Sequence, residues 1–261
     1  MNALKNLLNG IERGSQWPSE VIIVYMNEDA YNLEHVYSFP IRSIILHTDK
    51  GINLGAARNL AMQESSTENN IFLDVDCIPE EHLIANYAKH MDEEDVLFSG
   101  QVRYLPAGYD RSKDWEDKLH QLSLPDPIRG DLQEYTYELF WSLNFGCSKK
   151  TFKQIGGFDS QYEGYGAEDT DFAFEARKHG VTLKTIPALS YHQHHATYKP
   201  PLNHLQTIST NAALFFSKWA VWPMEGWLSS FEQLGYLRRD AGNLQVLRLP
   251  TDSEIEAVRT S

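Results

Sequence analysis

Two acidic clusters, one in each half of the chain, have the residue types that a single active site could use. Asp74 and Asp76 follow the apolar run at residues 71–73, and a carboxylate pair at a strand end suits a divalent cation and the phosphates it carries. The second cluster, Glu168 and Asp169, opens a predicted helix and could take the proton of a hydroxyl group. We therefore interpret the two clusters as halves of one site.

Each cluster also has a purely structural interpretation. Two aspartates one residue apart occur by chance in a chain of this length and can form a turn at a strand end. Glu168 and Asp169 would also stabilise the start of a helix through capping and through the helix dipole. The small residues before them, Gly164, Gly166 and Ala167, favour the functional interpretation, because they let another molecule approach the backbone.

Histidines late in the chain complete a candidate cation site. Residues 192–195 read His-Gln-His-His, and one or two of these imidazoles together with Asp76 would form a mixed set of nitrogen and oxygen ligands. Such a set, completed by diphosphate oxygens, favours Mn²⁺ over Mg²⁺, which binds nitrogen less readily. Asp74 would act through a water molecule or on a nucleotide ribose. A solvent-exposed histidine loop is the alternative interpretation.

Three further side chains have candidate roles beside the carboxylates. Arg58, near the start of the predicted helix 54–63, would hold a phosphate or orient an acidic side chain, or else lie on the surface. Tyr165 and Trp141 would stack on a sugar ring, or else fill the core. From the residues alone, both interpretations of each side chain stay open.

Composition restricts the class of protein. The chain has 261 residues, of which 42% are apolar, and a net charge of −13, which fits one soluble domain. The negative charge argues against nucleic acid or an anionic membrane as a general partner. Two cysteines, no signal peptide in residues 1–14 and no apolar run long enough to span a bilayer predict a cytoplasmic protein. The apolar stretch 212–227 would pack in the core or touch a membrane surface.

The elements that must position these residues alternate between strands and helices, which predicts an α/β fold with a mostly parallel sheet flanked by helices. Ligands of such sheets bind beyond the carboxyl ends of the strands, where Asp74 and Asp76 stand. Residues 106–130 are interpreted as a long loop or short helices over the site, and the tail beyond Pro250 as frayed. The predicted strands are residues 21–25, 43–47, 71–74, 96–99, 101–105, 141–148, 183–186 and 189–191, and the predicted helices are 54–63, 80–91, 149–155, 168–179 and 203–219.

Together these motifs resemble, in order and approximate spacing, glycosyltransferases of family 2 with the GT-A fold. The glycine-led Glu-Asp stretch is most similar to the galactosyltransferase and chondroitin-polymerase type. The resemblance covers about residues 21–195 and rests on Gly-Ile-Asn-Leu-Gly-Ala-Ala-Arg-Asn-Leu-Ala at 51–61, Phe-Leu-Asp-Val-Asp at 72–76, and Asn144 through Gly157-Phe158-Asp159 to Phe172.

The resemblance implies inverting transfer of a hexose from a UDP-sugar to a hydroxyl group of a glycan or another acceptor. Asp74 and Asp76 match the donor and metal motif, and Asp169 matches the base that takes the acceptor proton. The implied cofactor is Mn²⁺ or Mg²⁺, and UDP-galactose, UDP-N-acetylgalactosamine and UDP-glucose stay open as donors. The remaining matches are Arg58 near the donor phosphates, His192 and the alternative His195 as metal ligands, and Tyr165, Gly166 and Glu168 at the acceptor sugar.

The same resemblance predicts one domain over residues 1–261. Residues 1–105 would bind the nucleotide sugar, residues 106–200 would hold the acceptor and the catalytic base, and residues 201–261 would form a helical C-terminal extension. The corresponding biological expectation is a bacterial polysaccharide or glycan pathway, with the enzyme in the cytoplasm or at the inner face of the membrane.

Two departures from the family pattern bear on these expectations. Tyr165 stands where galactosyltransferases usually have Trp, which leaves the acceptor open. The chain also begins almost directly in the first predicted helix, at Asn2, so the usual first strand, which contacts the nucleotide base, is missing. The loss of an interior strand leaves backbone groups unpaired, and we therefore expect that this sequence omits a short N-terminal segment.

Two other functions fit the same residues. Carboxylates and histidines around a cation also serve nucleotidyltransferases and phosphohydrolases, which would consume nucleoside triphosphates or release phosphate without an acceptor. A binding protein that kept the fold and lost turnover would bind UDP without transferring a sugar. The oligomeric state is not indicated by the sequence.

Overall fold

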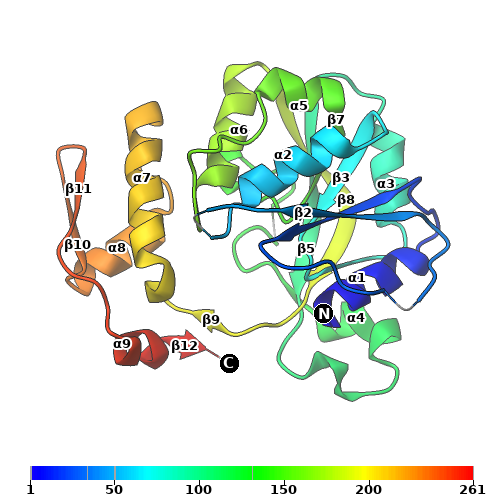
Figure 1. The fold of residues 1–261 in the computed structure, drawn as a ribbon, viewed down its shortest axis with the longest axis horizontal. Coiled ribbons are helices and arrows are strands. Elements are labelled where there is room, and N and C mark those ends of the chain that lie inside the picture. The colour runs from blue at the N-terminus through cyan, green and yellow to red at the C-terminus, as the bar shows by residue number, and fades with distance from the viewer. Residues whose placement is uncertain (1, 34, 50, 131, 261) are drawn as a thin grey trace.

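The computed structural model describes residues 2–33, 35–49, 51–130 and 132–260, which form a sheet with packed helices and a helical extension beside it (Figure 1). Over these residues the main sheet has six strands in the order β3-β7-β5-β8-β4, with β6 paired to β5. Its only parallel pair is β5 with β8. The strands are β3 (Asn69–Leu73), β4 (Cys77–Pro79), β5 (Val96–Tyr104), β6 (Leu124–Pro125), β7 (Asn144–Ser148) and β8 (Thr182–His192).

The first two strands are separate from the main sheet. β1 (Val21–Met26) and β2 (Ile41–Leu46) pair with each other in parallel. Among the described residues, no strand is hydrogen-bonded to the second edge of β1 or to the outer edge of β3. The α/β class is therefore confirmed. The predicted strand direction needs a correction: the main sheet is mixed, because β7 and β4 run antiparallel to their neighbours.

Helices cover both faces of the main sheet. They are α1 (Asn2–Glu12), α2 (Leu54–Glu64), α3 (Leu83–His90), α5 (Lys149–Ile155) and α6 (Glu168–Lys178). Side chains along β5 alternate between the faces: Leu97 packs in the cluster with α5 and α6, whereas Val96 and Phe98 pack in the cluster with α3. α2 begins where it does because the side chain of Asn53 accepts a 2.8 Å hydrogen bond from the amide of Ala56.

The stretch 106–130 is a loop with short helices, as predicted. Its elements are η1 (Tyr109–Arg111), η2 (Trp115–Lys118) and α4 (Leu119–Leu122), and η3 (Tyr137–Leu139) follows. Buried Arg129 donates a 3.0 Å hydrogen bond to Asp126 Oδ2, and its guanidinium carbon lies 4.1 Å from the ring centre of Trp141 and 4.9 Å from that of Tyr135. Trp141 therefore packs on an interior cation.

The C-terminal extension has its own apolar core. Its elements are η4 (Leu202–His204), α7 (Leu205–Trp219), α8 (Glu225–Gln233), β10 (Leu237–Asp240), β11 (Asn243–Val246), α9 (Asp252–Ala257) and β12 (Arg259–Thr260), and β12 pairs with β9 (Thr197–Tyr198). Ala212 and Phe215 are buried, which agrees with core packing of the apolar stretch at residues 212–227. None of the described helices is both long and apolar enough to cross a bilayer.

The tail beyond Pro250 is ordered, and the prediction of fraying is wrong. Thr251 and Glu254 form a capping box at the start of α9: the threonine hydroxyl accepts from the amide of Glu254, and the glutamate carboxylate accepts from the amide of Thr251.

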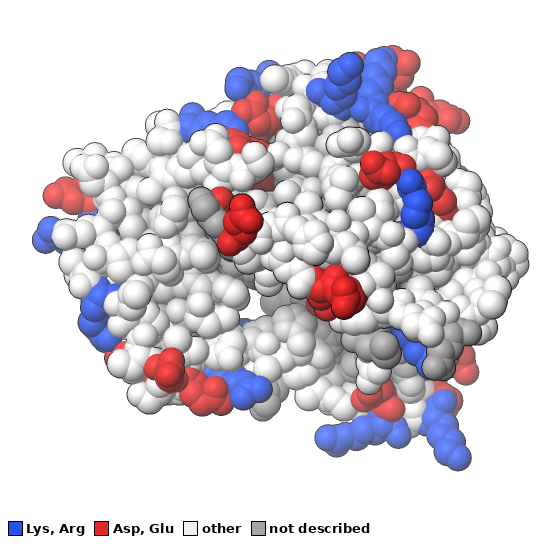
Figure 2. Space-filling view, in the orientation of Figure 1, with Lys and Arg blue, Asp and Glu red and all other residues white. Residues whose placement is uncertain are grey.

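On the face drawn in Figure 2, charged side chains stand mostly towards the rim, and the surface is hollowed near its centre.

Candidate functional site

The two acidic clusters lie together, joined by Arg58 of α2. The side chain of Arg58 is only 10% exposed; its Nη2 donates a 2.9 Å hydrogen bond to Asp74 Oδ1, and its Nη1 lies 3.7 Å from Glu168 Oε1. Its guanidinium carbon also lies 5.3 Å from the ring centre of Phe158. Arg58 is thus an interior residue that orients carboxylates, and the alternative of a surface arginine does not apply.

Asp76, which follows Asp74 by two residues, lies close to two of the predicted histidines, His192 and His195. Asp76 Oδ2 lies 3.4 Å from His192 Nε2 and 3.5 Å from His195 Nε2, and the three ligand atoms lie within 4.8 Å of one another. Pairing of β4 with β8 explains the approach, because Cys77 stands opposite His192 across the two strands. His194 is exposed and outside this cluster.

The donor set fits a divalent cation. One carboxylate and two imidazoles are the ligands expected for Mn²⁺ or a similar ion. Asp76 Oδ1 is buried and has no hydrogen-bond partner among the described residues, so a cation would satisfy an acceptor that these residues leave unpaired. Burial raises the pKa of Asp76 and lowers that of His192, which keeps the imidazole neutral and able to coordinate a metal.

The start of α6 presents the predicted base. Ala167 precedes the helix in a left-handed conformation with φ of 74°, and the amide of Thr170 donates a 2.8 Å hydrogen bond to Asp169 Oδ1. Burial and the nearby charge of Asp169 raise the pKa of Glu168 to about 7. Burial also raises the pKa of Asp169, and the positive charge of Arg58 opposes this shift. Two carboxyls with raised pKa values at a helix start suit proton transfer near neutral pH.

The loop before α6 is held by the C-terminal extension, which sequence reasoning missed. Asn211 of α7 is buried, and its Nδ2 lies 2.9 Å from the carbonyl oxygen of Gly166, 3.0 Å from that of Glu163 and 3.4 Å from that of Tyr165. The only signal in the sequence is a polar residue inside the apolar pattern of this helix. No local rule connects it to the loop.

The space beside the two glycines of this loop is filled by the protein itself. A Cβ on Gly164 would lie 2.6 Å from Thr207 Cγ2, and a Cβ on Gly166 would lie 2.6 Å from Met224 Sδ. Both glycines also have positive φ values, 74° and 99°, which disfavour other residues. The small residues therefore admit the C-terminal extension. Tyr165, between them, is exposed.

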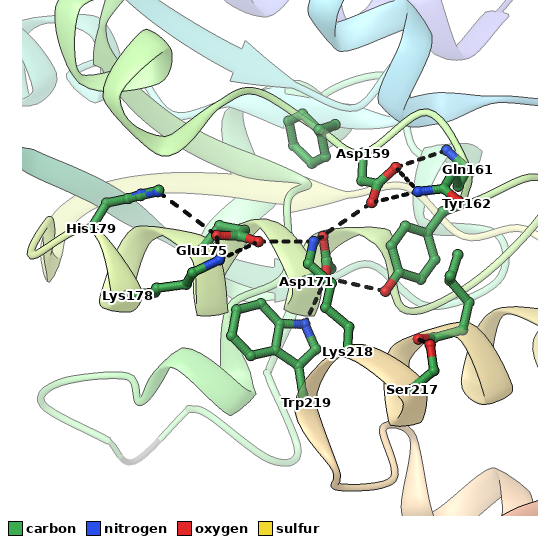
Figure 3. A network of polar contacts seen from close by, with 12 residues as sticks. Asp159, Gln161, Tyr162, Asp171, Glu175, Lys178, His179, Ser217, Lys218 and Trp219 are labelled. Atoms are coloured by element: carbon green, nitrogen blue, oxygen red, sulfur yellow. Dashed lines mark hydrogen bonds and ion pairs between the residues drawn. The ribbon is translucent and has the colours of Figure 1, made fainter.

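Asp171 of α6 anchors α7 through Lys218 and Trp219 (Figure 3). It is buried, and its Oδ2 lies 2.9 Å from Lys218 Nζ, while its Oδ1 accepts hydrogen bonds from Trp219 Nε1 at 2.7 Å and from the hydroxyl of Tyr162 at 3.1 Å. Lys218 Nζ also lies 2.9 Å from Glu175 Oε1. The helix that carries Glu168 and Asp169 is thereby fixed to the extension.

A cleft of about 570 Å³ adjoins the histidine cluster. Gln193, a second residue that sequence reasoning missed, lines this cleft. Its side-chain oxygen Oε1 accepts hydrogen bonds from Asn6 Nδ2 at 2.7 Å and from the Tyr109 hydroxyl at 2.9 Å. Its backbone N–H donates to the backbone carbonyl oxygen of Asp76. α1, η1 and the histidine segment thus meet at the cleft. Its lining residues are Asn2, Ala3, Asn6, Val75, Asp76, Gly108, Tyr109, Asp110, Gln193, His194 and His195.

Two family patterns match the chain. That of glycosyl transferase family 2 matches residues 3–156, and that described as the N-terminal domain of galactosyltransferase matches residues 132–199. The first covers Arg58, Asp74 and Asp76, and the second covers Asp169 and His192. Residues 200–261 lie outside both matches.

Two of the curated relatives are named as synthases of Pasteurella multocida. The chain is 23% identical to the hyaluronan synthase of Pasteurella multocida in an alignment 216 residues long, which covers 70% of this chain and 22% of the synthase. It is 20% identical to the chondroitin synthase of Pasteurella multocida (strain Pm70) in an alignment 215 residues long, which also covers 70% of this chain and 22% of that protein. The matched region is thus about a fifth of each relative.

Solved structures share the fold. S. aureus TarS superposes with a TM-score of 0.53 at 14% identity, over 82% of this chain and 61% of that chain. The mannosyltransferase PcManGT from Pyrobaculum calidifontis, solved with GDP-Man and Mn²⁺, superposes with a TM-score of 0.52 at 16% identity, over 83% and 60%. The predicted GT-A fold is confirmed.

Proposed function

Because the chain belongs to glycosyl transferase family 2, we propose that it moves a hexose from a UDP-sugar to a hydroxyl group of a glycan acceptor, by an inverting and metal-dependent reaction. The observation that carries the proposal is the convergence of Asp76, His192 and His195 within 4.8 Å. Asp74 and Arg58 connect this cluster to the carboxylates of α6.

Asp76, His192 and His195 would hold Mn²⁺ or Mg²⁺, and Asp74 would act through water or on the ribose. When bound, such an ion neutralises the negative charge of a diphosphate. Arg58 Nη2 lies 2.9 Å from Asp74 Oδ1 and orients that carboxylate. The cleft of about 570 Å³ beside the cluster is the place we assign to the nucleotide.

The carboxylates of α6 would act on the acceptor. Asp169 takes the proton of the attacking hydroxyl, whose oxygen then forms the new bond on the face of the anomeric carbon opposite the departing UDP, so that the configuration inverts. Glu168, with Tyr165 and Gly166, would bind the acceptor sugar. The relatives named as hyaluronan and chondroitin synthases and the neighbour solved with GDP-Man and Mn²⁺ support a nucleotide-sugar donor and a metal. Action in the cytoplasm stays a prediction.

Calorimetric titration of UDP, with and without Mn²⁺, tests the proposal. We expect Mn²⁺-dependent binding to the wild type and its loss in Asp76→Ala, whereas the control change Asp92→Ala, at an exposed aspartate outside the lining of this cleft, keeps the Mn²⁺ dependence. The same sample is then incubated with UDP-galactose, UDP-N-acetylgalactosamine and UDP-glucose. Absence of UDP binding would refute the proposal, and release of inorganic phosphate from nucleoside triphosphates without an acceptor would favour a phosphohydrolase.

A further inference from the structure

Three aromatic rings from separate segments stack at the junction of the two parts of the chain. The ring centre of Tyr165 lies 4.7 Å from that of His204, with 20° between the planes, and 5.7 Å from that of Trp227, with 27° between the planes. Tyr165 precedes α6, His204 ends η4, and Trp227 lies in α8. Tyr165 is 39% exposed, and the other two rings are half-buried, so this stack is open to solvent.

Tyr165, the ring that stacks on both of the others, is close to the acidic site. Burial and the negative charges of Asp169 and Glu168 raise the pKa of Tyr165 to about 12. Tyr165 is also only four positions before Asp169, across the short turn at Ala167. A molecule resting on the stack would therefore have the proposed base within its reach.

The geometry of the stack is fixed by built contacts on both sides. The side chain of Asn211 binds the carbonyl groups on either side of Tyr165, and Met224 and Thr207 fill the space beside the flanking glycines. The far end of α7 is anchored to α6 through Lys218 and Asp171, as Figure 3 shows. A ring that served only to fill a core would be buried, whereas Tyr165 is exposed and its loop is held in place by these contacts.

We propose that Tyr165, His204 and Trp227 form a sugar-binding subsite, and that the C-terminal extension thereby completes the acceptor site. This inference rests on the proposed glycosyltransferase function. Its physical basis is the apolar face of a pyranose ring, whose C–H groups carry partial positive charge and pack on the electron-rich faces of aromatic rings. Burial lowers the pKa of His204, so its imidazole is neutral at pH 7 and can both donate to and accept from sugar hydroxyl groups.

Saturation-transfer NMR with simple glycosides tests the subsite. The probes are methyl β-galactopyranoside, methyl N-acetyl-β-glucosaminide and methyl β-glucuronide, each added to the full chain with UDP and diamagnetic Mg²⁺. We expect at least one probe to receive saturation on its ring C–H protons. In Trp227→Ala and in His204→Ala this signal falls about five-fold, and in Trp227→Phe, which keeps a ring, most of it returns.

Trp222→Ala is the matched control. Trp222 belongs to the same extension but stacks on Phe216, with ring centres 4.2 Å apart, whereas the ring contacts of Tyr165 among the described residues are with His204 and Trp227. Removal of the Trp222 ring should leave the saturation signal unchanged. If Trp227→Ala does not fold, His204→Ala still tests the subsite, because His204 is outside the apolar core cluster of the extension. If UDP binds the wild type but no probe is saturated, or if the signal survives in both ring-deleted variants, the subsite is refuted. If UDP itself does not bind, the proposed function fails instead.

Discussion

Glu168 Oε1 lies 3.7 Å from Arg58 Nη1, and each side chain is only 10% exposed. The positive charge of one guanidinium therefore acts on the carboxylates of Asp74, Glu168 and Asp169, although the Asp74 side chain is 39% exposed. Negative charge exceeds positive charge there, which is why burial together with Asp169 raises the pKa of Glu168 to about 7 despite the nearby cation. Glu168 should then exchange its proton near neutral pH, whereas for Asp169 burial raises the pKa and the positive charge of Arg58 opposes this shift.

The first prediction concerns stability and pH. Because the folded pKa of Glu168 is about 7 against 4.5 in the unfolded chain, the folded state binds the proton more tightly. Its contribution to stability is fully present below pH 4.5 and is lost as pH rises through about 7. Glu168→Gln should remove this loss and raise the free energy of unfolding above pH 7. Urea unfolding of the metal-free protein across this range measures it, with the exposed Glu81→Gln as the control; equal slopes for both variants would contradict the prediction.

The second prediction concerns the catalytic base. Asp169→Asn keeps the shape of the side chain and its hydrogen bond from Thr170 but cannot take a proton, so kcat should fall by about 10²- to 10⁴-fold. In the wild type, kcat/KM should rise with pH as the carboxyl pair loses its proton. The pH profile of UDP release with an accepted glycoside checks both statements. A variant within ten-fold of wild type would assign the base elsewhere.

The third prediction separates three neighbouring histidines. His192→Ala and His195→Ala should each weaken Mn²⁺ binding by about ten-fold or more, because each removes one of three ligands. His194→Ala should leave the affinity unchanged, since this side chain is exposed and outside the cluster. Electron paramagnetic resonance of free Mn²⁺ during titration measures the affinities. An effect of His194→Ala equal to that of its neighbours would mean that the loop binds the ion in a different arrangement.

Local structure was predictable because its determinants are close in the sequence. The strand expected as residues 96–99 and 101–105 is the single strand β5 with a register shift between Ser99 and Gln101. Gly100 stands at that shift because a Cβ there would lie 2.3 Å from Asn144 Nδ2. The sequence also identified the carboxylates, Arg58 and the histidines that the fold brings together, although their roles stay predictions.

Long-range relations were not predictable from the same patterns. An apolar run has no information about strand direction, so the antiparallel placement of β7 was missed. The contact of Asn211 with the loop at 163–166 joins residues with no local signal in common. The ordered tail is different: Thr251 and Glu254 have the spacing of a capping box, and this signal was present but not used.

The fourth prediction concerns the anchor between α6 and α7. Lys218→Met leaves buried Asp171 without its cation, and loss of one partner of a buried pair costs about 3 to 5 kcal/mol. We expect about 3 kcal/mol, at the lower end, because Lys218 is 26% exposed and Asp171 keeps the hydrogen bonds from Tyr162 and Trp219.

Lys178→Met is the matched control for this anchor. Lys178 contacts the same Glu175, at 3.0 Å, but is 58% exposed, so its loss should cost less than about 1 kcal/mol. Urea unfolding gives both values. Because Lys218 also fixes α7, and α7 holds the loop before Asp169 through Asn211, the Lys218 variant should lose turnover even under conditions where it remains folded. Full turnover in a folded Lys218→Met would show that the extension does not position the carboxylates.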